Sequence, residues 1–105
     1  MTPEQENLCL EIITHAGNGR AAAFAALEAA KRGAFQAAEA ELQAAENELG
    51  LAHHVQTRLL SGEAEGVGMT PSLLLVHAQD QLMTAISERT LIAEMIALYR
   101  RLEAR

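Results

Sequence analysis

Residues 76–84 read Val-His-Ala-Gln-Asp-Gln-Leu-Met-Thr and hold a histidine and a carboxylate three positions apart within an apolar segment. On a helix, this spacing puts both side chains on one face. At about 100° per residue, an arc of roughly 80° takes in further residues of the segment. This set, called the polar stripe below, consists of Leu73, His77, Asp80, Thr84, Ser87 and Leu91. The remaining apolar residues lie largely on other sides of the helix. The helix therefore has one face for a core and a second face, which we interpret as the face that carries the functional residues.

Composition favours an all-α fold before any periodicity is considered. The chain has 105 residues, of which 50% are hydrophobic and only 3% are aromatic. This length supports one domain, taken here as residues 1–105, with a modest core. Alanine, which has the highest helix propensity, is abundant, whereas strand formers such as Val and Thr are sparse. We therefore expect a single helical domain.

The predicted first helix begins at a capping box. Thr2 is a suitable N-cap, Pro3 suits the first helical position, and Gln5 stands where the box is completed. The segment Gly17-Asn18-Gly19 interrupts the apolar pattern, so we expect a kink or a break in the first helix there. The pattern then resumes, and Gly33 is predicted to end the helix as a C-cap.

Two further helices are predicted downstream. Apolar residues three or four positions apart predict a helix over 34–60. Residues 61–68 contain three glycines and two acids and are predicted to form a flexible loop. Thr70 as the cap and Pro71 at the first position predict a third helix to about residue 102, which ends in basic residues. The expected architecture is an antiparallel three-helix bundle.

Charge and targeting signals restrict the class of function. The formal net charge is −6, and eight basic residues are scattered along the chain. They do not form the basic patch that nucleic acid or an anionic membrane requires. Residues 1–6 are acidic and lack the apolar segment of a signal peptide. The single cysteine, Cys9, stands in an apolar helical segment and is predicted to be a buried structural thiol. We expect a cytoplasmic protein that binds no nucleic acid and does not insert into a membrane.

Apolar residues on two faces of the third helix indicate self-association, because two neighbouring helices cannot cover both faces. If the oligomer is cyclic and this helix lines its axis, Asp80 from each copy meets the others there. Carboxylates that close cannot all stay ionised unaided, so they share protons or bind a cation. A hard divalent ion such as magnesium suits such a site.

Two segments resemble a known family, namely residues 52–57 (Ala-His-His-Val-Gln-Thr) and 76–84. They are similar to the lactose/chitobiose class of enzyme IIA proteins of the bacterial phosphoenolpyruvate-dependent sugar phosphotransferase system. The similarity extends over nearly the whole chain and includes residues 16–20, 25–31 and 33–35. Members of this family are trimers of three-helix protomers that carry a phosphoryl group on the histidine of the His-Ala-Gln-Asp motif.

The resemblance implies a role for each residue of this motif. His77 corresponds to the phosphorylated histidine, and Asp80 corresponds to the metal ligand on the trimer axis. Gln79 is implied to help hold the phosphoryl group, across a subunit boundary. His53 is a second candidate for phosphoryl binding, which either packs near the site or faces solvent. The implied donor is the phosphocarrier protein HPr, and the implied acceptor is a cysteine of the cognate enzyme IIB. The transported sugar is implied to be a disaccharide such as chitobiose, cellobiose or lactose.

The chain departs from the family pattern at three positions. Many relatives have a histidine in place of Gln81 and acids in place of Ala34 and Leu51. None of these departures touches His77 or Asp80.

Two other functions fit a small helical protein with a prominent histidine. A histidine phosphotransfer protein of two-component signalling is one, but that family has a basic residue and a glycine just after the histidine, whereas here Asp80 and Gln81 stand there. A non-catalytic helical assembly module, whose polar stripe only fixes the register of an oligomer, is the other. A di-iron bundle is disfavoured because no Glu-x-x-His pair occurs in the chain.

Overall fold

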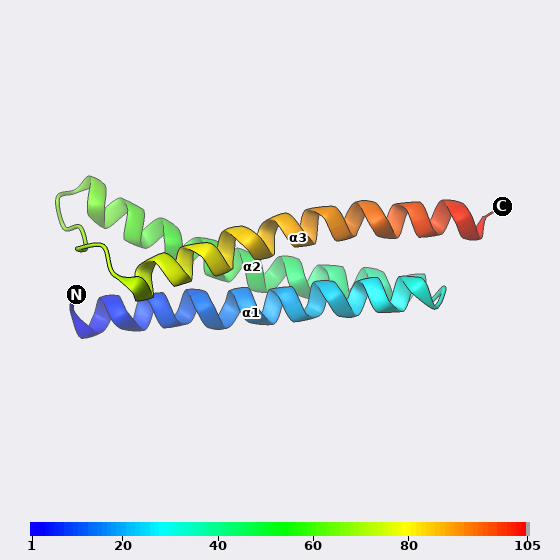
Figure 1. Ribbon diagram of the computed structural model, residues 1–105, viewed down its shortest axis with the longest axis horizontal. Coiled ribbons are helices and arrows are strands. Elements are labelled where there is room, and N and C mark those ends of the chain that lie inside the picture. Colours follow the sequence, from blue (N-terminus) through cyan, green and yellow to red (C-terminus); the bar gives the residue numbers. More distant parts are fainter. Residues whose placement is uncertain (105) are drawn as a thin grey trace.

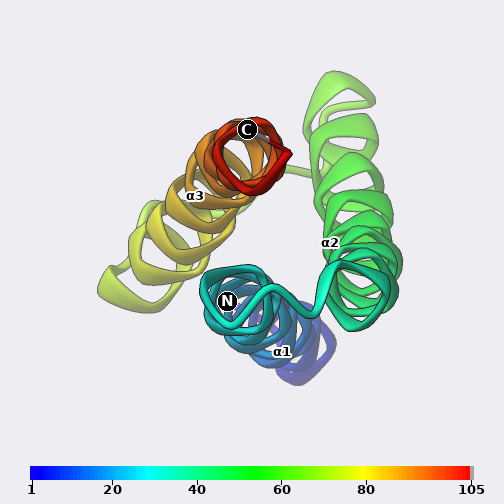
Figure 2. The same ribbon diagram turned by 90° about the vertical axis from the view of Figure 1, so that its right-hand side faces the viewer.

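The computed structural model describes residues 1–104 and folds them into three long helices that alternate in direction (Figure 1). They are α1 (Pro3–Lys31), α2 (Phe35–Ala64) and α3 (Leu73–Glu103). No strand occurs within residues 1–104, and the molecule measures 56 × 19 × 19 Å. The prediction of an all-α, antiparallel three-helix bundle is confirmed. Viewed along its length, the bundle is triangular, and α2 and α3 diverge toward the end at which residues 65–72 connect them (Figure 2).

Helix α1 begins as predicted. The Thr2 hydroxyl accepts a hydrogen bond from the backbone N–H of Gln5 at 3.1 Å, and the Gln5 side-chain oxygen accepts one from the backbone N–H of Thr2 at 2.9 Å. Pro3 occupies the first turn, where the N–H that it lacks has no partner within the helix. The capping box therefore satisfies the backbone where the chain enters the bundle.

The expected kink or break at Gly17–Gly19 is wrong, because α1 continues through this segment without interruption (Figure 1). Gly19 is buried against α2, and a Cβ atom built on it would lie 2.7 Å from Leu49 Cγ and 3.3 Å from the Ala45 carbonyl oxygen. The glycine therefore allows two helices to approach closely rather than ending one of them. Helical hydrogen bonding and this packing outweigh its low helix propensity.

The two glycines of α1 are expected to respond to alanine in opposite directions. Gly19→Ala is expected to lower the free energy of unfolding by about 1–3 kcal/mol, because its Cβ overlaps Leu49. Gly17→Ala is the matched control: nothing lies within 4 Å of its Cβ, so the gain in helix propensity should raise stability by about 0.5–1 kcal/mol. Urea melts followed by circular dichroism at one protein concentration measure both. Two changes of the same sign would contradict the packing role of Gly19.

The end of α1 also follows the prediction. Gly33 has φ +77°, its N–H donates to the Ala30 carbonyl, and the N–H of Ala34 donates to the Ala29 carbonyl. This paired pattern is a Schellman motif, which requires the left-handed conformation that glycine adopts without strain. Ala34 then precedes α2 and offers no side-chain cap, because its methyl side chain cannot accept a hydrogen bond.

The predicted end of α2 at residue 60 and the loop over 61–68 are partly wrong, because residues 61–64 are helical. Gly66, with φ +88°, ends the helix with a second Schellman motif, in which the N–H of Val67 donates to the Gly62 carbonyl at 2.8 Å. The glycine that can adopt a positive φ therefore sets the end of the helix, whereas Gly62 is accommodated inside it.

The start of α3 also differs from the prediction. Ser72, rather than Thr70, is the N-cap: its hydroxyl accepts a hydrogen bond from the N–H of Leu75 at 3.2 Å, and Pro71 lies outside the helix. The sequence offers two hydroxyl caps, and the structure uses the second. The basic residues Arg100 and Arg101 occupy the last turn, where they complement the helix dipole as expected.

The core consists mainly of small side chains. Cys9 is fully buried, as predicted, and burial, with a smaller contribution from the Glu6 carboxylate, raises the pKa of its thiol. Ile12, Leu82 and Ile96 are the other large side chains with full burial, and alanines fill much of the remaining interface between the helices. Among the described residues, no helix combines the length and the apolarity needed to cross a membrane.

Candidate functional site

His77 lies in the second turn of α3, and its side chain is exposed on the outside of the bundle. With Leu73 and Leu74 it lines a shallow, largely apolar pocket. Leu73 is 86% exposed, which is unusual for a leucine within a helix. Within residues 1–104 the imidazole makes no hydrogen bond or ion pair, so both ring nitrogens are open to a reacting partner.

All six residues of the polar stripe are exposed, as the helical spacing predicts. The opposite face of α3 holds Ala78, Leu82 and Ala85, which are buried. The Thr84 hydroxyl donates to the Asp80 backbone carbonyl at 2.6 Å, whereas the Asp80 carboxylate has no ion-pair partner within residues 1–104. The polar stripe therefore points away from the core of its own chain.

An apolar seam continues the polar stripe toward the C-terminus of α3. It consists of Met95, Leu98 and Leu102, which are 43%, 58% and 53% exposed. Their spacing of three and four keeps them on the same side of the helix as His77 and Leu91. One long face of α3 is therefore uncovered, polar in its first half and apolar in its second.

Gln79 lies on a different side of α3 from His77. Residues two positions apart on a helix do not face each other, and Gln79 is directed toward α2, where its side-chain oxygen accepts a hydrogen bond from the Gln56 amide. The structure therefore does not bring Gln79 to His77 within one chain.

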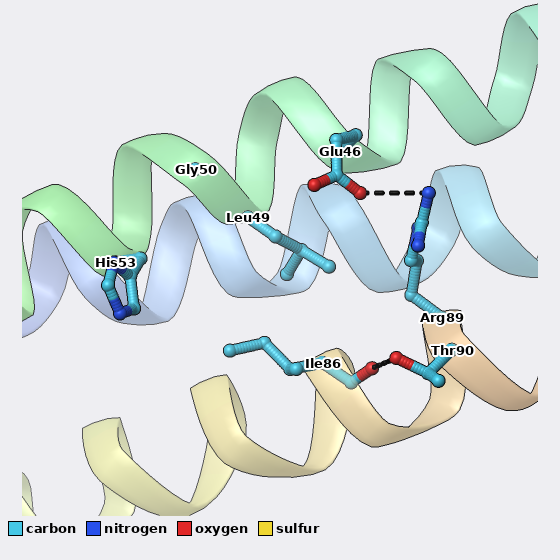
Figure 3. Close-up of a pocket in the computed structure, with 7 residues that line it drawn as sticks. All are labelled: Glu46, Leu49, Gly50, His53, Ile86, Arg89 and Thr90. Carbon is cyan, nitrogen blue, oxygen red and sulfur yellow. Dashed lines mark hydrogen bonds and ion pairs between the residues drawn. The ribbon is translucent and has the colours of Figure 1, made fainter.

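His53 lies in a groove between α2 and α3 with a volume of about 290 Å³ (Figure 3). Leu49 and Ile86 form its apolar wall, and an ion pair at 2.9 Å between Arg89 and Glu46 lies at one end. His53 and His77 line different pockets, and no hydrogen bond joins them within residues 1–104. Within one protomer, His53 is thus not part of the His77 site.

Gln56 of α2 is buried in the bundle. Its amide donates to Gln79 and lies 4.0 Å from the sulfur of Met83. A signal for this burial exists in the sequence, since Gln56 follows Ala45, Leu49 and Ala52 in the spacing that α2 uses for its core. A glutamine at this spacing in α2 is therefore a polar residue at a position where the pattern predicts burial.

A histidine–carboxylate hydrogen bond and an ion pair join α1 to the other helices. His15 Nδ1 lies 2.6 Å from Glu48 Oε2 on α2, so His15 contributes to a helix interface. Arg20 lies 3.1 Å from Glu88 on α3. Because both pairs cross between helices, they add specificity to the packing around the alanine-rich core.

A single chain does not provide a complete metal site within residues 1–104, because no three His, Cys, Asp or Glu side chains converge there. Asp80 is the only carboxylate of the polar stripe. Its oxygens suit a hard cation, but further ligands must come from water or from other copies of the chain.

Comparison with known proteins gives a consistent family. Residues 7–100 match the model of the family described as PTS system, Lactose/Cellobiose specific IIA subunit. The lichenan-specific phosphotransferase enzyme IIA component of Bacillus subtilis (strain 168) is 45% identical over 97% of this chain and 93% of that protein.

Solved structures agree with the sequence comparison. The cellobiose-specific enzyme IIA of Bacillus anthracis superposes with a TM-score of 0.96 at 41% identity, covering 100% of this chain and 96% of that chain. A solution structure of the IIA(Chitobiose)–HPr complex, from the N,N'-diacetylchitobiose branch of the Escherichia coli phosphotransferase system, gives a TM-score of 0.84 at 42% identity. It covers 97% of this chain and 99% of that chain. This chain therefore belongs to the lactose/cellobiose-specific IIA family and is a phosphotransferase component of a sugar phosphotransferase system.

Proposed function

We propose that His77 carries the phosphoryl group in this protein, accepting it from HPr and passing it to a cysteine of the cognate enzyme IIB. The observation that carries the proposal is the exposed imidazole in the second turn of α3, which makes no hydrogen bond within residues 1–104 and is bordered by apolar Leu73 and Leu74. A neutral imidazole is a good nucleophile near pH 7.

The chemistry consists of two displacements at phosphorus. A ring nitrogen of His77 attacks the phosphoryl group of phosphorylated HPr, so that a new P–N bond forms while the bond to the donor breaks. The cysteine thiolate of enzyme IIB then attacks the same phosphorus, and the imidazole leaves. Because the transferred group changes little between carriers, the protein contributes mainly position and charge stabilisation.

The partners follow from the exposure of this site. A donor and an acceptor must each reach the same nitrogen in turn, and a histidine on the outer face of a helix is accessible to both. The similarity to the IIA(Chitobiose) chain solved in complex with HPr supports HPr as the donor.

The sugar class is inferred from the relatives. Two of the relatives are named for cellobiose and N,N'-diacetylchitobiose, which are disaccharides, and one is named for lichenan, a β-glucan polymer. We therefore expect the complete system to transport a disaccharide such as chitobiose, cellobiose or lactose. We expect selection among these sugars to belong to the membrane component of the system.

The proposal is tested by supplying phosphoenolpyruvate, enzyme I and HPr to the purified protein and measuring its intact mass. An acid-labile adduct of one phosphoryl group per chain, present only when all three components are supplied, is the expected result. Absence of the adduct from the wild-type protein would overturn the phosphocarrier function.

We further propose a homotrimer in which the polar stripe and the apolar seam of α3 face a common axis. Exposed leucines along one helix face are the groups that a second and third copy would cover. The flanks of this face differ: Glu88 pairs with Arg20 of α1 on one flank, and Gln79 bonds Gln56 of α2 on the other. His77 shares the flank of Glu88, because a separation of eleven residues is close to three helical turns.

Cyclic symmetry then completes the site between copies. The α1 flank of one α3 faces the α2 flank of the next, so Gln79 of a neighbouring copy approaches His77. Its amide is expected to donate to the phosphoryl oxygens, which carry the negative charge.

A divalent cation on the axis is the remaining part of the proposal. Asp80 lies near the middle of the polar stripe, and its carboxylate has no ion-pair partner within residues 1–104, so three copies would present three carboxylates to one point. These oxygens would hold an ion such as magnesium. The ion would neutralise the negative charge of the carboxylates, whose mutual repulsion otherwise destabilises the trimer.

Asp80→Leu is expected to abolish binding of the divalent cation while the trimer persists. The leucines remove three like charges, so the variant should melt at a higher temperature than the wild type after treatment with a chelator. Elemental analysis measures the metal, and light scattering compares each protein with three times the chain mass of 11.3 kDa. Equal metal content in the two proteins would exclude the axial site.

A further inference from the structure

Gln56 is the one polar side chain buried in the bundle within residues 1–104, with 9% of its surface exposed. Its neighbours Ala52 and Val55 on α2 are also buried. An amide in such surroundings is unfavourable unless it is hydrogen-bonded, and an apolar side chain of similar length would pack there without this requirement. Packing alone therefore does not explain the residue.

The hydrogen bond of Gln56 acts on the residue proposed to hold the phosphoryl group. The Gln56 side-chain amide donates to the oxygen of Gln79, and within residues 1–104 the nitrogen of Gln79 has no acceptor. An amide has one oxygen and one NH₂ group. Fixing the oxygen toward α2 consequently leaves the NH₂ group of Gln79 as the part that can donate outward.

We propose that Gln56 is a positioning residue for phosphoryl transfer: it holds the side chain of Gln79 so that its NH₂ group, rather than its oxygen, faces the phosphoryl group on His77 of the neighbouring copy. This inference rests on the proposed phosphocarrier function. The direction matters because an amide oxygen turned toward the phosphoryl oxygens would repel them, whereas the NH₂ group attracts them.

Two substitutions separate positioning from packing. Gln56→Met keeps the length of the side chain and removes the donor, so the Gln79 amide is free to turn. Gln56→Glu introduces an acceptor without a donor, so Gln79 is expected to direct its NH₂ group toward the carboxylate and its oxygen toward the phosphoryl group. A packing role predicts that Met is tolerated better than Gln at this buried position.

The expected result is that transfer from phosphorylated HPr to His77 slows about tenfold in Gln56→Met, and more in Gln56→Glu. Rates are measured by quenched flow and intact mass on trimers whose thermal melts show that they are folded. In a Gln79→Leu background, neither substitution at Gln56 should slow transfer further. A wild-type rate in Gln56→Met, or an equal slowing in both backgrounds, would overturn the positioning role.

A second readout does not depend on phosphoryl transfer. In the NMR spectrum of the wild-type protein, the side-chain NH₂ resonances of Gln79 should differ clearly from those in Gln56→Met, because its carbonyl loses a hydrogen bond. Unchanged resonances would overturn the inference. If the wild-type protein accepts no phosphoryl group, the proposed function fails, and these resonances still decide whether Gln56 orients Gln79.

Discussion

Replacing His77 by alanine is expected to leave the protein with no phosphoryl adduct when phosphoenolpyruvate, enzyme I and HPr are supplied. The loss should be complete, because the substitution removes the nucleophile rather than a group that assists it. His77 is the histidine of the polar stripe, and its ring makes no bond within residues 1–104 that would compete with attack on phosphorus. Intact mass after a fixed reaction time measures the outcome.

The other histidines provide controls. His54→Ala changes an exposed residue of α2, and His53→Ala changes the groove that Figure 3 shows, so both variants should take up one phosphoryl group as the wild type does. His15→Ala removes the hydrogen bond to Glu48 and should lower stability without preventing uptake. An adduct on His77→Ala would assign the reaction to one of these residues. No adduct on any of the proteins would favour the helical assembly module.

Mixing an inactive variant with a slow one is expected to raise the rate of transfer above that of either alone. His77→Ala lacks the nucleophile, and Gln79→Leu should slow transfer by about 10²-fold, since loss of one donor to a developing charge has an effect of this size. In a cyclic trimer each site combines His77 of one copy with Gln79 of the next. A trimer that contains both variants therefore has one site in which both residues are intact.

The experiment refolds the two variants together, so that mixed trimers form, and measures the rate of transfer per chain. His77→Ala refolded with the double variant His77→Ala/Gln79→Leu is the control and should stay inactive, because no copy supplies the histidine. If the mixture is no faster than Gln79→Leu alone, Gln79 does not act across the boundary between copies. A wild-type rate in Gln79→Leu alone would remove this residue from the site altogether.

The faces of the helices were predictable from sequence because they depend on local spacing. The three- and four-residue periodicity placed the polar stripe on the exposed face of α3, and the capping box placed the start of α1. Both features involve residues within a few positions of each other. The resemblance to the IIA family rested on similar short segments, and the comparisons confirm that family.

Features that depend on a distant partner were missed. Gly19 was expected to weaken α1, because the close approach of Leu49 from α2 is not visible in the sequence around it. The end of α2 was misplaced because either Gly62 or Gly66 could have ended the helix, and the positive φ at Gly66 decides between them. The bond between Gln56 and Gln79 joins residues 23 positions apart, so only the folded chain reveals it.

The alanine-rich core also affects how this protein comes to be folded. Small side chains exclude less apolar surface from water than leucine or isoleucine do, so each chain gains less hydrophobic free energy from its own interior. Several of the large apolar side chains, namely Leu91, Leu98 and Leu102, lie outside that interior. If copies cover these leucines, folding and assembly are one process, and a newly made chain reaches its full stability only after it meets two others.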